Sequence, residues 1–70
     1  MIDKKELEKL RHKFPKGTRV VLVQMDDKYA PPVGTKGTVQ GIDDIGSIIV
    51  NWDNGSTLNA LYEIDIVKKC

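Results

Sequence analysis

The chain has 70 residues, of which 40% are hydrophobic, and eleven Lys and Arg oppose ten Asp and Glu. This length accommodates one small domain, whose single core leaves little room for a deep catalytic cleft. The near-neutral charge excludes a uniformly basic polyanion-binding protein, and the apolar fraction excludes a disordered tail.

Residues 3–14 are predicted to form a helix. Leu7, Leu10 and Phe14 are three and four positions apart, so they share one helical face. Asp3 is a suitable N-cap residue, and Pro15 ends the helix. A helix of this length is marginal alone, so we expect its apolar face to pack against the rest of the domain.

The remainder of the chain is predicted to form five short strands separated by turns, over residues 18–25, 35–42, 47–52, 56–60 and 64–67. The first strand is apolar at every position from Val20 to Val23, which indicates a place near the centre of the core. Gly37 and Gly41 allow a bulge or a bend in the second strand. A single helical turn is expected over residues 61–63.

The turn before the fourth predicted strand carries the strongest local signal, Asp53–Asn54–Gly55. An Asn-Gly pair is typical of the type I′ turn, in which both central residues have positive φ. Trp52 precedes this turn and has the same strand parity as Ile48 and Val50. The ring is therefore predicted to be in the core rather than on a ligand-binding surface, although both interpretations remain open.

One helix followed by five strands predicts a mainly β protein, a small five-stranded SH3-like barrel with an N-terminal α-helix. The whole chain is expected to be one domain, with the helix over residues 3–14 and the barrel over residues 18–68. The oligonucleotide-binding barrel is a weaker alternative, because it usually needs longer strands and more residues.

Two runs of residues, 34–39 (Gly-Thr-Lys-Gly-Thr-Val) and 50–56 (Val-Asn-Trp-Asp-Asn-Gly-Ser), resemble those of the family called domain of unknown function 4314. The upstream residues 15–20 and 25–32 fit the same family, so the resemblance covers nearly the whole chain. It implies a bacterial, phage or mobile-element origin and supplies no catalytic or binding residue. The 50–55 stretch is also similar to that of Mind-bomb-type SH3-like domains, which bind protein tails.

No residue set predicts an enzyme, a metal site or a cofactor. His12 stands alone on the basic helix, and one His with one Cys falls short of a zinc ligand set. The aspartates in the predicted turns are typical of turn chemistry, with weak divalent binding as an alternative. No apolar run is long enough to cross a membrane, and Cys70 is the single cysteine, so we expect a cytoplasmic protein with an exposed terminal thiol.

The charges are unevenly distributed along the chain. Residues 1–19 hold seven basic and three acidic residues, whereas residues 20–67 hold two lysines and seven acidic residues. One interpretation is a helix whose polar face is merely solvated. The alternative is a nucleic-acid-binding accessory protein whose helix contacts the phosphate backbone through Lys4, Lys5, Arg11 and Lys13.

Aromatic residues in loops indicate a second kind of surface. In SH3-like barrels such residues form a shallow groove for extended or proline-rich peptides. The residues expected to form it here are Tyr29, Pro32, Trp52 and Tyr62. The alternative is that the tyrosines only cover the barrel end. We therefore expect a monomeric, non-enzymatic binding or adaptor module whose partner is another protein or a peptide.

Overall fold

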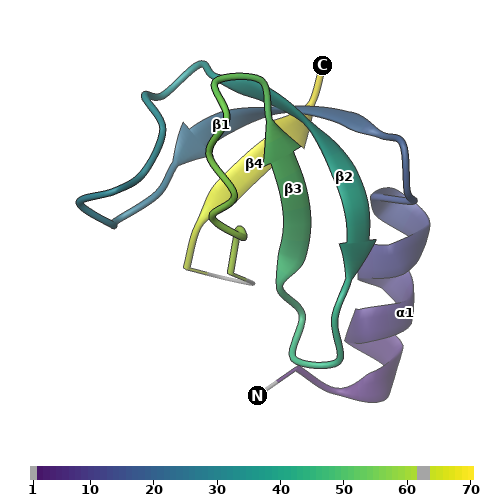
Figure 1. Ribbon diagram of the computed structural model, residues 1–70. Coiled ribbons are helices and arrows are strands. Elements are labelled where there is room, and N and C mark those ends of the chain that lie inside the picture. Colours follow the sequence, from purple (N-terminus) through teal and green to yellow (C-terminus); the bar gives the residue numbers. More distant parts are fainter. Residues whose placement is uncertain (1, 62–63) are drawn as a thin grey trace.

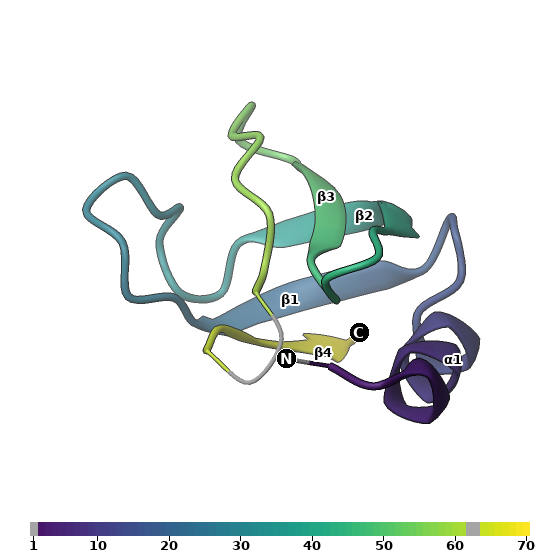
Figure 2. The same ribbon diagram turned by 90° about the horizontal axis from the view of Figure 1, so that it is seen from below.

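The computed structural model describes residues 2–61 and 64–70, which form one helix and a single antiparallel sheet (Figure 1). The elements within the described residues are α1 (Lys4–Lys13), β1 (Arg19–Gln24), β2 (Lys36–Ile42), β3 (Ile48–Trp52) and β4 (Ile66–Lys69). The strand order is β3-β2-β1-β4, so β1 and β2 are central. Seen from below, α1 and the long β1–β2 loop lie at opposite ends of the sheet (Figure 2).

The N-terminal helix α1 spans Lys4–Lys13, so it is one residue shorter at each end than the predicted 3–14. The Glu6 amide donates to Asp3 Oδ1 at 2.8 Å, which makes Asp3 the N-cap. Phe14 leaves the helical conformation because the proline that follows disfavours it. Phe14 is buried in the core and Leu10 packs against that core, so the expected docking of the apolar face is confirmed for these two residues.

The core lies on one face of the sheet. The most deeply buried side chains belong to the three strands β1, β2 and β3: Val20, Leu22, Val39 and Val50. On β1 the buried residues alternate with Val21, which is half-buried, and Val23, which is 37% exposed. The central position predicted for this strand is correct, but its second face is not part of the core. This alternation is typical of an antiparallel sheet with one solvated face.

Two glycines of β2 have different structural roles. The β2–β3 register shifts between Val39 and Gly41, which confirms the bulge predicted there. Gly37 lies opposite Trp52, and a Cβ added to it would be 2.9 Å from the Asn51 carbonyl oxygen and 2.9 Å from Trp52 Cε3. A glycine is required at position 37 because the tryptophan ring and the neighbouring backbone occupy the space of a side chain.

The turn that follows β3 differs from the predicted type I′ turn. The Gly55 amide donates to the Trp52 carbonyl at 2.9 Å, and the Trp52 amide donates to the Ser56 carbonyl at 3.2 Å. The central residues are therefore Asp53 and Asn54, and Gly55 follows them with a φ of +91°. This is the pattern of a three-residue hairpin loop that ends in a left-handed glycine.

The turn that precedes β3 repeats this arrangement. The Gly46 amide donates to the Asp43 carbonyl, and the Asp43 amide donates to the Ser47 carbonyl, both at 3.1 Å. Gly46 has a φ of +86°. Asp43 Oδ1 also accepts from the amides of Ile45 and Ser47. The same kind of turn thus flanks β3 at both of its ends.

The predicted five-stranded barrel is wrong, because the fourth predicted strand, residues 56–60, does not form. Ala60 alone pairs with Ile48 as an isolated bridge. The Ser56 amide donates instead to Asn54 Oδ1, and the Leu58 amide donates to Ser56 Oγ. These local side-chain bonds replace the ladder that a strand would need. The sheet therefore stays open, with β3 and β4 at its two edges.

The last strand is displaced from its predicted position. It spans Ile66–Lys69 rather than residues 64–67, and it pairs with β1 from Val20↔Lys69 to Gln24↔Ile66. A turn precedes it, in which the Leu61 carbonyl accepts from the amides of Ile64 and Asp65. The helical turn expected over residues 61–63 includes 62 and 63, which lie outside the described residues.

Candidate functional site

The four residues of the predicted aromatic groove have different environments. Tyr29 is 72% exposed and Pro32 is exposed, both on the β1–β2 loop. Trp52 is only 3% exposed, so its ring belongs to the core and offers almost no surface to a ligand. Tyr62 lies outside the described residues. Among the described residues, the tyrosine and the proline are thus the predicted groove residues that solvent reaches.

Trp52 instead positions a neighbouring segment. Its indole Nε1 donates to the Leu58 carbonyl at 2.7 Å, which holds the irregular segment after the turn against β3. The bridge between Ala60 and Ile48 fixes the same segment two residues later. Leu58 is half-buried as a result. The ring thereby determines where the residues that follow it present their side chains.

These side chains line one wall of a groove that we call the acidic groove. It has a volume of about 250 Å³, and its lining residues are Met25, Asp26, Asp27, Leu58, Asn59, Leu61, Ile64 and Asp65. The first three come from the start of the β1–β2 loop, and the others come from the segment between β3 and β4. Leu61 is 40% exposed and Ile64 is 57% exposed, so aliphatic surface faces solvent at this place.

The three carboxylates of the acidic groove have no basic partner among the described residues. Asp27 Oδ1 accepts from the Tyr29 amide, and Asp65 Oδ2 accepts from the Leu61 amide, which leaves the second oxygen of each without a described partner. Asp26 makes no hydrogen bond or ion pair with any described residue. Lys28, the basic residue next along the chain, places its Nζ over the Tyr29 ring at 5.0 Å.

Two carboxylates beside β3, those of Asp53 and Asp44, are paired with arginines, whereas Asp43 accepts from backbone amides. Arg19 contacts both oxygens of Asp53, through Nη1 at 2.8 Å and Nη2 at 2.6 Å, and its Nη1 also donates to Thr38 Oγ1. The hydrogen bonds from Arg19 lower the pKa of the Asp53 carboxyl, and the same bonds raise the pKa of Arg19. On the helix side, Arg11 contacts Asp44 Oδ1 at 3.2 Å.

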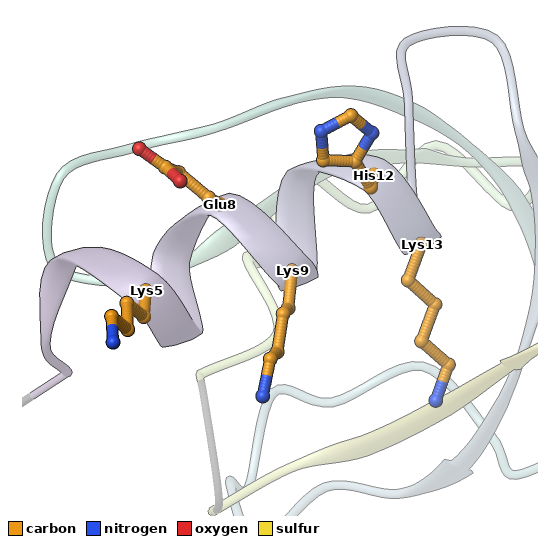
Figure 3. Close-up of a pocket in the computed structure, with 5 residues that line it drawn as sticks. All are labelled: Lys5, Glu8, Lys9, His12 and Lys13. Atoms are coloured by element: carbon orange, nitrogen blue, oxygen red, sulfur yellow. The ribbon is translucent and has the colours of Figure 1, made fainter.

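Of the cations predicted to contact nucleic acid, Lys4, Lys5 and Lys13 are exposed on α1, whereas Arg11 is engaged within the chain. Arg11 is bound to Asp44 and to the Ile42 carbonyl, so its guanidinium serves the contact between α1 and the β2–β3 hairpin. Lys5, Lys9 and Lys13 extend along one side of α1, whereas Glu8 and His12 point to the other side (Figure 3). Lys9, which the sequence analysis did not select, completes this row because the three lysines are four residues apart.

The remaining predictions concern metals and membranes. The part of the chain that the structure describes holds no group of three His, Cys, Asp or Glu residues able to bind a metal ion. The three aspartates of the acidic groove therefore do not form such a group. None of the helices in that part is long and apolar enough to cross a membrane.

Sequence reasoning missed the aliphatic residues of the acidic groove. Leu58, Leu61 and Ile64 are three residues apart, a spacing that does not fit the two-residue alternation of a strand. This mismatch was the available signal. Comparison with curated proteins finds no match, and comparison with solved structures finds none either. The model of one protein family matches residues 3–70, nearly the whole chain. The protein therefore belongs to the family described as Domain of unknown function (DUF4314).

Proposed function

We propose that the protein is a non-enzymatic binding module that holds a segment of a partner protein in the acidic groove. The observation that carries this proposal is the exposure of Leu61 and Ile64 beside half-buried Met25 and Leu58. Apolar side chains that line a concave surface favour the docking of another apolar surface. Leu58 is held by Trp52 and Ala60 by its bridge to Ile48, so this part of the wall is formed before a partner arrives.

The shape of the groove favours a short peptide segment over a small metabolite. A volume of about 250 Å³ lies below the range of about 300–1,000 Å³ that is typical of small-molecule pockets. Its two walls come from different parts of the chain, the β1–β2 loop and the segment before β4. An extended peptide lying between these walls would contact both.

The test is selection of a random peptide library on the full chain, followed by mapping of the enriched peptides by amide chemical shifts. We expect the largest shifts at residues 25–27 and 58–61. Ile64→Ser should weaken binding of each enriched peptide by about tenfold, since a buried isoleucine contributes about 1.5–3 kcal/mol. Ile45→Ser is the matched control, because Ile45 is 70% exposed in the turn before β3. No enrichment, or shifts confined to α1, would refute the proposal.

A second candidate function rests on the lysine row of α1. Lys5, Lys9 and Lys13 are exposed on one side of the helix, and phosphate contacts of this kind favour binding to a nucleic acid backbone. The protein is titrated with labelled single- and double-stranded DNA and RNA at about 50 mM and about 200 mM salt. Binding that weakens steeply with salt, and that is lost in Lys5→Gln/Lys9→Gln/Lys13→Gln, is expected. The control is Lys28→Gln/Lys36→Gln/Lys68→Gln, which changes the net charge equally.

A further inference from the structure

We infer that the segment held in the acidic groove is cationic, with Lys or Arg side chains next to aliphatic ones. This inference rests on the proposed function and names the chemistry of the partner. Its starting point is the part of the groove lining that the structure describes, which contains three aspartates and no Lys, Arg or His.

The first argument is that the groove charge is not neutralised within the described residues. The three ion pairs of the described chain join Lys9 to Glu6, Arg11 to Asp44 and Arg19 to Asp53, and none reaches the groove. A partner that brings cations would therefore find carboxylate oxygens whose charge is unpaired. Like charges brought to the same place would be repelled, so the groove discriminates against acidic segments.

The second argument concerns the oxygens themselves. Asp27 Oδ1 and Asp65 Oδ2 are held by backbone amides at 2.8 Å and 2.9 Å, which fixes the orientation of each carboxylate. The other oxygen of each has no described partner. A guanidinium or ammonium group can bind these oxygens without breaking the local turns. Such oriented acceptors favour charge-assisted hydrogen bonds over diffuse attraction.

The third argument is the arrangement of apolar and charged groups. The aliphatic side chains Leu58, Leu61 and Ile64 lie on the same wall as Asp65, and Met25 precedes Asp26 and Asp27 on the other. A segment that fits both kinds of group must itself alternate aliphatic and cationic side chains. The aliphatic groups would supply the affinity, and the carboxylates would decide which segments are accepted.

The experiment analyses the enriched peptides of the library selection described above. We expect Lys and Arg to be enriched, and Asp and Glu to be depleted, relative to the unselected library. The most enriched peptide is then made with a fluorescent label and titrated against the full chain. Replacing its Lys and Arg by Gln should weaken binding about tenfold, and raising the salt from about 20 mM to about 300 mM should weaken the parent peptide but not the Gln peptide.

Variants of the protein test whether the groove carboxylates recognise the cations of the peptide. Asp26→Asn/Asp27→Asn/Asp65→Asn keeps an oxygen to accept from the backbone amides and removes the charge. It should bind the parent peptide about tenfold more weakly and the Gln peptide unchanged. Asp44→Asn is the control, because Asp44 is a highly exposed carboxylate paired with Arg11 away from the groove lining.

Each remaining outcome has a definite meaning. Enriched peptides that bind the groove without an excess of Lys and Arg, or that ignore the triple variant, would overturn the cationic partner and leave the proposed function intact. The absence of any enriched peptide would overturn both. Sedimentation that shows dimers dispersed by the triple variant would support the cationic segment but place it on a second copy of the chain, and would thereby overturn the separate partner protein of the proposed function.

Discussion

Two aspartates beside β3, Asp44 and Asp53, differ from the aspartates of the acidic groove in what surrounds their charge. Asp44 and Asp53 stand in the two turns that bound β3, and each is contacted by an arginine from another element. Asp27 and Asp65 also stand in turns, but their carboxylates accept hydrogen bonds from backbone amides alone among the described residues, and the Asp26 side chain forms no hydrogen bond or ion pair with a described residue. Turn chemistry explains why aspartate occurs at these places. It does not explain why Asp44 and Asp53 are paired with arginines whereas the groove aspartates, like Asp43, form no ion pair with a described residue.

The charges of Asp44 and Asp53 take part in contacts between elements of the fold, whereas the charges of the groove aspartates take part in no such contact among the described residues. Arg11 joins α1 to the β2–β3 hairpin, and Arg19 joins the start of β1 to the turn after β3. Both arginines therefore hold elements together. No element of the described chain is held by the charge of the groove aspartates. A net charge of +1 for the whole chain hides this division completely.

The largest effect on stability is expected at Trp52, the residue that connects β3 to the acidic groove through its hydrogen bond to Leu58. Trp52→Ala removes a ring that is 97% buried, and should lower the free energy of unfolding by about 3–5 kcal/mol. This approaches the whole stability of so small a domain. Urea unfolding followed by circular dichroism measures the loss. A variant that unfolds at nearly the wild-type urea concentration would place the ring outside the core.

Trp52→Phe keeps most of the ring and removes the indole donor to the Leu58 carbonyl. We expect this variant to remain folded and to lose about 1 kcal/mol. Because the bond positions one wall of the acidic groove, the amide shifts of residues 57–61 should change more than those of the β2–β3 hairpin. Equal changes in both regions would argue against a link between Trp52 and the groove.

An intermediate effect is expected at two glycines near the end of β3. Gly37→Ala should destabilise by about 1–3 kcal/mol, since the new Cβ meets the Asn51 carbonyl and the Trp52 ring. Gly55→Ala meets no atom within 4 Å, but its φ of +91° is strained for alanine, so a loss of about 1 kcal/mol is expected. Thermal unfolding compares the two. The reverse order would contradict the close approach of Trp52 to β2.

The smallest expected effect on stability is that of replacing Asp53, the aspartate paired with Arg19, and it depends on pH. The pKa of Asp53 is lowered by Arg19, so the stabilisation from this pair is present above the ordinary aspartate pKa of about 3.9 and is lost as the pH falls through the lowered value. Asp53→Asn should therefore be less stable than wild type at pH 7 and should lose less stability in acid. Urea midpoints between about pH 7 and about pH 2.5 test this.

Asp26→Asn is the matched control for that measurement, because it makes the same change of charge where no arginine is in contact. We expect its stability at pH 7 to equal or exceed that of wild type, since it removes one of three neighbouring negative charges. A loss as large as that of Asp53→Asn would mean that the groove carboxylates also hold the fold together.

The parts of the fold that depend on local signals could be predicted from the sequence. Asp3 caps α1 as expected, and Ile48, Val50 and Trp52 alternate as expected because parity along a strand needs no tertiary information. The turn after β3 was located correctly, but its type was not. Asn54–Gly55 is compatible with two hairpin geometries, and the hydrogen bonds of Trp52 select the one in which only the glycine needs to be left-handed.

The absence of the fourth predicted strand and the presence of the acidic groove could not be predicted, for a related reason. Residues 56–60 read as a strand, but the side chains of Asn54, Ser56 and Trp52 bond the backbone of this segment in other ways. The groove then forms between residues that are distant in sequence, such as Met25 and Ile64. Their proximity depends on how the open sheet is completed, which no pattern within one segment encodes.

The short connection between β2 and β3 also has a consequence for the order of folding. Val39 faces Val50 across a short turn, whereas Val20 faces Lys69 across most of the chain, so closing the second loop costs more entropy. We expect the β2–β3 hairpin to be formed in the transition state and β4 to dock afterwards. Val50→Ala should then slow refolding, while Val67→Ala should mainly accelerate unfolding. Since β4 docks last, the segment that carries Ile64 and Asp65 would be the last part of the acidic groove to assemble.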